Sequence, residues 1–177
     1  FRDIPQFTRY GNWECNFTPE SALCQIDKWV AEEGLDIDPD FQRLHVWSES
    51  QQIAWLEFFF RGGKTGRVLY FNNPAWNRFR AEKEDRFVMV DGKQRLMAIR
   101  RFFGNEISIF GSRRSDFVDR PDMMRTLLLN VNDLPTRADV IRWYIEMNAG
   151  GTPHTEAEIE KARLLLNPNP QKLEVLR

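Results

Sequence analysis

The stretch RFVMVDGKQRLMAI, from Arg86 to Ile99, decides how the middle of this chain folds. Its first residues are apolar and mostly β-branched, as a buried interior strand requires, and the strand is expected to end at Asp91. Gly92 permits a tight turn or a close approach of the backbone. The apolar residues that follow recur at helical spacing, which predicts a helix that ends near Gly104.

An acid, a glycine and two bases meet at this predicted corner between strand and helix. A helix N-terminus presents free N–H groups and partial positive charge, which suit an anion. Lys93, Gln94 and Arg95 add side-chain donors in the same turn, and Asp91 stands where it could hold a metal or orient water. The corner is therefore a candidate phosphate site, although Asp-Gly pairs also occur at turns for geometric reasons alone.

The composition is that of a globular domain with a core. The chain has 177 residues, of which 42% are hydrophobic. Its 25 basic and 26 acidic residues nearly cancel, which gives no sign of a strong overall attraction to nucleic acid. Cys15 and Cys24 suit neither a disulfide framework nor a metal site. No apolar run is long enough to cross a bilayer and no secretory signal is visible, so we expect no membrane partner and a cytoplasmic protein.

Strand and helix signals follow one another irregularly along the chain. Strands are predicted at residues 9–17, 66–71, 88–91, 106–110 and 126–131. Helices are predicted at residues 19–33, 49–60, 93–103, 136–147 and 155–166. The first helix is expected to bury Leu23, Ile26 and Val30, and the charged residues 111–122 are expected to form a mobile loop. Because strands and helices do not alternate strictly, the pattern favours a compact α+β domain with a small mixed sheet and several packed helices.

A second candidate for phosphate binding follows the turn at residues 38–40. Arg43 could make a bidentate contact with a phosphate, and it could equally form a surface ion pair with Asp38 or Asp40. The glycine-rich run at residues 62–66 lacks the spacing of a phosphate loop and is explained by a helix stop and a turn.

A third candidate is the glycine loop at residues 148–154, between two predicted helices. The backbone N–H groups of Gly150 and Gly151 could face a ligand, and His154 could act as a general acid or base. A helix C-cap followed by the entry to the next helix explains the same residues equally well.

These segments together resemble a known family. The order is an aromatic-Gln-Arg segment at 41–43 with Trp47 soon after, Asp-Gly-x-Gln-Arg at 91–95, and Asn-x-Gly-Gly-x-Pro-His-Thr at 148–155. This order resembles the DGQQR-motif domain, the N-terminal half of GmrSD-type modification-dependent restriction enzymes, which is related to the ParB/sulfiredoxin fold. The similarity spans about residues 35–165 and looks closest to stand-alone phage or prophage members.

The resemblance implies a ParB-like nucleotide-binding core at residues 35–166, preceded by a strand and helix of the same domain at 1–34 and followed by a tail at 167–177. It implies a nucleoside triphosphate as substrate or ligand, and Asp91 is the expected Mg²⁺ ligand. The implied catalytic residues are Asp91 and Arg95. The implied phosphate-binding residues are Gln42, Arg43, Gly92, Lys93 and Gln94, with Asn148, Gly150, Gly151 and His154 as accessory residues.

Two features depart from the family. Lys93 stands where the motif often has Gln, and a cation there should not harm phosphate binding. The restriction enzymes also carry a separate HNH-type nuclease half, and the only histidines in this chain are His45 and His154. DNA cleavage by that route is therefore not expected.

Three functions stay open at this point. The preferred one is nucleotide hydrolysis or phosphodiester chemistry in a phage or restriction context. The second is a non-catalytic module that senses nucleotide or clamps DNA or RNA with the basic residues Arg78, Arg80, Arg100, Arg101, Arg113 and Arg114. The third is an inhibitor or regulator that binds a host protein through the aromatic residues near Trp76 and Phe79.

Overall fold

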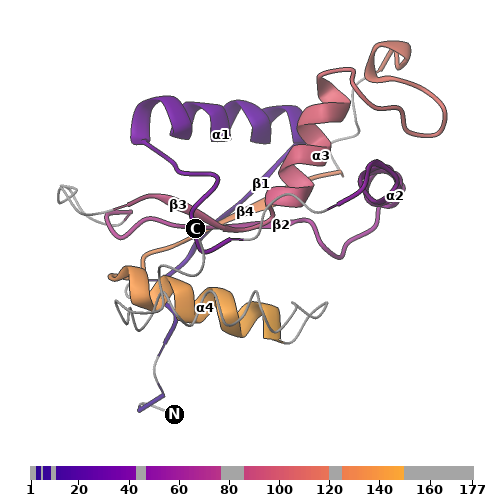
Figure 1. The fold of residues 1–177 in the computed structure, drawn as a ribbon. Coiled ribbons are helices and arrows are strands. Elements are labelled where there is room, and N and C mark those ends of the chain that lie inside the picture. The colour runs from indigo at the N-terminus through magenta and orange to yellow at the C-terminus, as the bar shows by residue number, and fades with distance from the viewer. Residues whose placement is uncertain are drawn as a thin grey trace, which may run out of the picture.

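A four-stranded mixed sheet separates two layers of helices (Figure 1). The computed structural model describes residues 3–4, 6–8, 11–42, 47–76, 86–119 and 125–149. The strands are β1 (Trp13–Phe17), β2 (Val68–Asn72), β3 (Val88–Asp91) and β4 (Leu127–Asn132), and their order in the sheet is β1-β4-β2-β3. The central pair β4 and β2 is parallel, whereas the outer pairs are antiparallel. The α+β class and the mixed sheet predicted from the sequence are confirmed.

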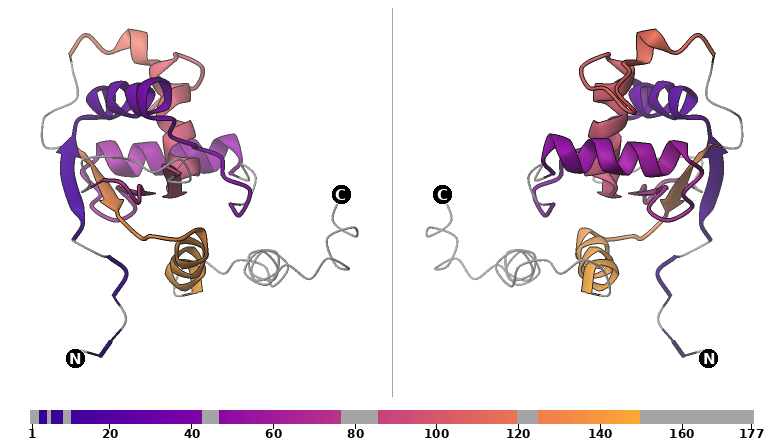
Figure 2. Two further views of the ribbon diagram at one scale, coloured as in Figure 1. Left: turned by 90° about the vertical axis from the view of Figure 1, so that its left-hand side faces the viewer. Right: turned by 90° about the vertical axis from the view of Figure 1, so that its right-hand side faces the viewer.

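The helices divide unequally between the two faces of the sheet. Helices α1 (Pro19–Glu33) and α3 (Lys93–Phe103) lie over one face, and α2 (Glu49–Phe60) packs beside α3 (Figure 1). Helix α4 (Arg137–Ala149) lies on the opposite face, next to β3, and Figure 2 shows the same layers from both sides. Within the described residues, every helix is too short or too polar to cross a lipid bilayer.

Local capping signals set the ends of the first two helices. The Thr18 side chain accepts from the backbone of Ser21, and Gly34 ends α1 in the left-handed conformation at φ 70°. Ser48 and Gln51 form a reciprocal capping box at the start of α2. The predicted bounds of both helices are therefore confirmed. The predicted buried stripe of α1 is partly wrong, because Trp29 is 2% exposed and Val30 is 41% exposed.

The larger core lies between the sheet and the layer of α1, α2 and α3. Trp29 stands at its centre, with its ring centroid 5.2 Å from that of Phe87, 5.3 Å from Phe71 and 5.6 Å from Trp76. Edge-on contacts of this kind add to the free energy gained from burying the rings. Trp76 is half-buried and packs against this core, and the host-protein interface predicted near it stays a prediction.

The predicted strand at residues 106–110 is wrong. Ile107 and Ile109 are buried, as the alternation suggests, but they pair with no strand, and Ile109 makes only an isolated bridge to Ser112. Phe110 adopts a positive φ of 49°, which ends the extended conformation. The two isoleucines fill the core under the helices without adding a strand to the sheet.

The predicted loop at 111–122 is anchored over its described part. It contains a short 3₁₀ helix, Arg114–Asp116, and the Arg114 guanidinium lies 3.1 Å from the Glu20 carboxylate on α1. The ring of Phe117 packs against that of Phe102 at 6.1 Å. An ion pair and a ring contact thus hold this segment against two helices.

Strand β3 lies at the edge of the sheet, although its apolar run predicts an interior strand. Both of its faces are nevertheless buried: Phe87 and Met89 face the larger core, and Val88 and Val90 face α4. Asp36 covers the open edge, because its N–H donates to Phe87 O at 2.9 Å and its carbonyl accepts from Met89 N at 2.8 Å. Burial on three sides explains why an edge strand has the composition of an interior one.

The Asn72 amide fixes the connection from β4 to α4. Its side chain is fully buried, donates to Leu134 O at 3.1 Å and accepts from Leu134 N at 2.8 Å. We expect Asn72→Ala to lower the free energy of unfolding by about 2 to 3 kcal/mol, because two backbone groups lose their partner without gaining water. Urea denaturation measures the change. The matched control is Asn16→Ala, at an exposed position, and an equal effect of the two substitutions would contradict this role.

Candidate functional site

Three motif segments that lie far apart in the sequence meet at one small hollow. The hollow has a volume of about 30 Å³, and residues from the 36–42 segment, from the corner between β3 and α3, and from α4 line it. These residues are Gln42, Val90, Asp91, Gly92, Lys93, Gln94, Tyr144 and Asn148. Most of the predicted phosphate-binding residues and one accessory residue are therefore neighbours in the structure.

Strand β3 brings these segments together. The Gln42 side chain donates a hydrogen bond to the carbonyl of Met89, which holds the 36–42 segment against the free edge of the strand. On the adjacent face, Val88 and Val90 pack with Val140 and Tyr144 of α4. The last turn of α4 then carries Asn148 to the hollow, where its amide donates to Tyr144 O at 2.7 Å.

The N-terminus of α3 has no side-chain cap. Its N-cap residue is Gly92, and the first helical hydrogen bond runs from Leu96 N to Gly92 O at 2.9 Å. The N–H groups of the three residues between them consequently lack a partner within the helix. Hydroxyl side chains occupy the equivalent position in α1 and α2. The uncapped terminus opens onto the hollow and can accept an anion there.

Each of the two cations at this corner already has a carboxylate partner. Lys93 forms an ion pair with Asp38, and Arg95 forms one with Asp91. The Arg95 side chain is 17% exposed and does not line the hollow, so it lies behind Asp91 and not beside the anion position. Asp91 lies between the hollow and Arg95, because it lines the hollow and also bonds to the Arg95 guanidinium. The predicted phosphate ligands are therefore near one another, but Arg95 contacts the carboxylate.

Tyr70 is a neighbour of this pair that the sequence analysis missed. An irregularity in the pairing of β2 with β3 sets Tyr70 opposite Asp91, while Phe71 pairs with Met89. Burial raises the pKa of the Tyr70 phenol, the Asp91 and Glu14 carboxylates raise it further, and Arg95 opposes them. Tyr70 therefore stays protonated and can donate a hydrogen bond at neutral pH. Only the non-local register reveals it, because no motif marks the position.

Several predicted residues do not join the site. Arg43, Gly150, Gly151 and His154 lie outside the described residues, as do the predicted helix at 155–166 and the tail at 167–177. Neither carboxylate considered as a partner of Arg43 is unoccupied, since Asp38 binds Lys93 and Asp40 binds Arg137 at 2.6 Å.

The arginines of the predicted nucleic-acid clamp are mostly engaged with acidic side chains. Arg100 pairs with Asp27, Arg101 with Glu49 and Glu106, and Arg114 with Glu20. Arg78 and Arg80 lie outside the described residues. Paired guanidinium groups attract a phosphate backbone less than free ones do, so the described surface gives this interpretation little support.

Asp91 is the one residue of the site that could contribute to binding a divalent cation. The described residues contain no cluster of three or more metal-binding side chains, and Cys15 and Cys24 are free thiols. Mg²⁺ usually takes only one or two protein carboxylates and obtains its other ligands from water and substrate phosphates. The Asp91 oxygen that does not bond to Arg95 suits that requirement, so this corner fits a cation that arrives with a nucleotide.

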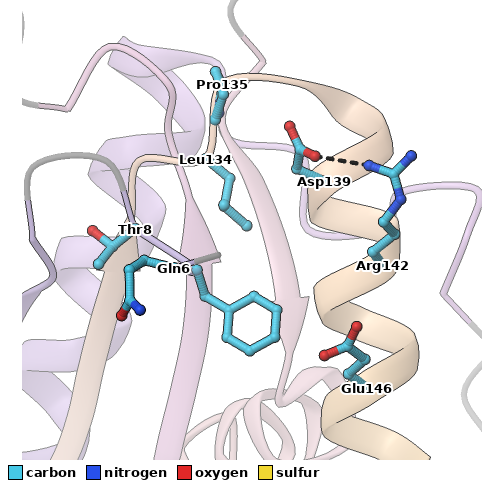
Figure 3. A pocket seen from close by; sticks show the side chains of 8 residues that line it. Gln6, Thr8, Leu134, Pro135, Asp139, Arg142 and Glu146 are labelled. Atoms are coloured by element: carbon cyan, nitrogen blue, oxygen red, sulfur yellow. Dashed lines mark hydrogen bonds and ion pairs between the residues drawn. The ribbon is translucent and has the colours of Figure 1, made fainter. Parts of the chain in front are cut away.

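Among the described residues, two larger cavities lie beside α4. The first, of about 570 Å³, lies between the N-terminal residues 6–8 and the outer side of α4 (Figure 3). Asp139 and Arg142 bond to each other at 2.9 Å on its wall, and none of the motif residues lines it. The second, of about 460 Å³, lies beside Phe41 and Val88 and is thus adjacent to the motif residues.

Comparison with family models, curated proteins and solved structures finds no match to this chain. The resemblance to the DGQQR-motif domains therefore stays a prediction from the sequence motifs. Independently of that resemblance, residues 42, 91–94 and 148 meet at one hollow.

Gly92 is required by the geometry of the corner. Its φ is 110°, and a Cβ there would lie 2.5 Å from Leu69 Cδ2 and 3.2 Å from Met89 Cε. We expect Gly92→Ala to cost about 2 to 4 kcal/mol of unfolding free energy, through backbone strain and overpacking. The control is Gly34→Ala, at φ 70° with open space around the Cβ, which should cost about 1 kcal/mol in the same denaturation assay. Equal losses at both positions would contradict a special constraint at Gly92.

The charges around Tyr70 should appear in its titration. In the folded protein its pKa lies above the usual 10.0, so the stability that the neutral phenol contributes is present below pH 10.0 and is lost as the pH rises further. Asp91→Asn should lower this pKa and Arg95→Met should raise it, as followed by the ultraviolet absorbance of the phenolate. Tyr70→Phe identifies the signal, and Asp116→Asn on the far helix layer is the control. If Asp91→Asn leaves the Tyr70 pKa unchanged, the two side chains are not neighbours.

Proposed function

We propose that this chain contains a nucleotide-binding domain related to the DGQQR-motif family, with a ParB-like fold and a site at the corner between β3 and α3. The observation that carries the proposal is the uncapped α3 N-terminus, which opens onto the hollow lined by all three motif segments. Its ligand is a nucleoside triphosphate, and its reaction is hydrolysis of that ligand in a DNA-related context such as phage infection or restriction.

The phosphate is the part of the ligand that fits the hollow. A volume of about 30 Å³ accommodates one or two water-sized groups, so phosphate oxygens enter it and the remainder of the nucleotide stays outside. The N–H groups of the first α3 turn face an anion there, and the Gln94 side chain is held nearby because its carbonyl accepts from Trp47 N at 3.1 Å. Lys93 supplies a positive charge for the phosphate. Its partner Asp38 is 58% exposed, so a phosphate can replace that carboxylate beside the Lys93 ammonium.

Asp91 and Arg95 take different parts in this proposal. The Arg95 guanidinium holds the Asp91 carboxylate in place, and Tyr70 stands opposite the same carboxylate. Asp91 is thereby positioned to orient water or to bind Mg²⁺, and the metal would neutralise charge on the transferring phosphoryl group. Arg95 acts as a positioning residue, and Gln42 supports the site by fixing the 36–42 segment to β3.

Lys93 provides the test of the phosphate site. We expect Lys93→Ala to weaken the binding of all four nucleoside triphosphates about tenfold, because a charge-assisted contact to phosphate is lost. Thermal shift and phosphate release, measured with each triphosphate and Mg²⁺, report binding and turnover. Asp91→Asn should retain binding and lose turnover. Lys64→Ala is the matched control, because Lys64 is exposed in the turn after α2.

A variant of Asp38, the partner of Lys93, adds a second test of the phosphate site. Asp38→Asn should strengthen triphosphate binding several-fold, since it removes the carboxylate that competes for the Lys93 ammonium. Binding that is unchanged in both the Lys93 and the Asp38 variants would reject the phosphate site. Turnover of the Asp91 variant at the wild-type rate would reject the hydrolytic function while leaving binding in place.

A further inference from the structure

The hollow at the α3 N-terminus is too small to hold more than part of a nucleotide, so the nucleoside must lie elsewhere. Within the part of the chain that the structure describes, the cavity of about 460 Å³ beside Phe41 is adjacent to the hollow and of suitable size. Five of its nine lining residues are apolar, namely Phe41, Pro74, Val88, Pro135 and Val140, and the other four, Asn72, Arg86, Thr136 and Arg137, are polar or charged. A base can pack its apolar faces against the first set while its polar edge meets the second.

The cavity and the hollow are lined by neighbouring residues of the same three segments, which are residues 36–42, β3 and α4. Phe41 lines the cavity and the next residue, Gln42, lines the hollow. On β3 the corresponding residues are Val88 and Val90, which face the same side of the strand about 7 Å apart. On α4 they are Val140 and Tyr144, which are separated by one turn, about 6 Å.

Phe41 and Tyr144 form the partition between the two spaces. Their ring centroids are 5.4 Å apart in an edge-on contact, so each space has one aromatic ring at the shared wall. A ribose passing over this pair would connect a phosphate in the hollow with a base in the cavity. The separation of about 6 to 7 Å along β3 and α4 is comparable with the width of one sugar.

Arg86 is the polar side chain of the cavity that lacks a partner. Asn72 is bonded to the Leu134 backbone, Thr136 caps α4 at Asp139, and Arg137 pairs with Asp40. Among the described residues, no carboxylate pairs with the Arg86 guanidinium, which lies at an exposed position of the lining. A guanidinium donates hydrogen bonds and accepts none. It therefore favours base edges that carry carbonyl acceptors, as guanine O6 and the uracil carbonyl do, over the amino groups of adenine and cytosine.

We infer that the cavity lined by Phe41, Val88, Val140 and Arg86 is the nucleoside subsite of the phosphate hollow, and that Arg86 selects bases with a carbonyl at that edge. This inference rests on the proposed function, because the hollow supplies the phosphate end of the same ligand. The selected ligands are guanosine and uridine triphosphates.

Calorimetric titration in the presence of Mg²⁺ tests the subsite. The probes are the non-hydrolysable imido analogues of the four nucleoside triphosphates, together with inorganic triphosphate, which has no base. The guanosine and uridine analogues should bind about tenfold more tightly than the adenosine and cytidine analogues or inorganic triphosphate. Arg86→Ala should remove that tenfold preference and leave the affinity for inorganic triphosphate unchanged.

Two further variants complete the experiment. Arg61→Ala removes an exposed arginine at the end of α2 and should change none of the affinities. Val140→Phe fills the cavity, and it should lower the affinity for the guanosine and uridine analogues to that for inorganic triphosphate. Its melting temperature shows whether the fold is retained, and Arg86→Ala tests the subsite at the surface if it is not.

The outcomes separate the two proposals. If inorganic triphosphate binds as tightly as all four analogues, the phosphate site stands and the nucleoside subsite is rejected. If the four analogues bind alike and Arg86→Ala has no effect, selection by Arg86 is rejected. If none of the five probes binds, the proposed function itself fails, and the subsite fails with it.

Discussion

The enclosure of β3 is the constraint on which the site depends. Met89 of this four-residue strand lies in the larger core, Val88 and Val90 lie under α4, and Asp36 and Gln42 cover the free edge. The 36–42 segment brings Gln42 to the carboxyl end of the strand, and α4 brings Asn148 there. A shift of the strand by one residue would exchange its two faces, so the same packing that stabilises β3 also sets the position of Asp91.

Charge at the site is balanced by two ion pairs of different character. Lys93 and Arg95 are enclosed to a similar degree, at 14% and 17% exposure, but their carboxylate partners differ, because Asp38 is 58% exposed and Asp91 is 38% exposed. Removing either partner of the Arg95–Asp91 pair would leave a partly buried charge without compensation. In the proposed function, an arriving anion therefore displaces Asp38 from Lys93 more easily than it separates Asp91 from Arg95, since the Asp38 carboxylate is the more exposed of the two.

Sequence signals that act within one turn or one strand predicted the structure well. The caps at Thr18 and Ser48, the stop at Gly34 and the strand at 126–131 are all confirmed, because the interactions responsible are local. The strand predicted at residues 106–110 was wrong, because alternating burial can arise from packing under helices as well as from pairing in a sheet. The edge position of β3 could not be predicted either, since composition reports burial and not hydrogen-bonded neighbours.

The site shows the same division between local and non-local information. Its motifs were visible as residue types, and Gly92 and the α3 N-terminus followed from the strand-to-helix turn. The roles of Arg95 and Tyr70 depend on contacts that residue spacing does not determine. The Arg95 guanidinium binds Asp91, four residues earlier, and does not line the hollow. Tyr70 lies opposite Asp91 because the pairing of β2 with β3 is irregular at that point. Arg95 in particular has the right position in the motif for a phosphate ligand, and only the folded structure shows that its guanidinium binds Asp91.

The lysine at position 93 is accommodated by a residue outside the motif. The DGQQR-motif domains often have Gln there, and a neutral amide needs no counter-ion when the site is empty. A lysine that is 14% exposed does need one, because burying an ammonium without a partner is costly. Asp38, carried to this point by the segment that covers β3, meets that need. In the proposed function Lys93 thus supplies charge for an anion at the α3 N-terminus, and Asp38 neutralises that charge in the free protein, so the two positions act together although 55 residues separate them.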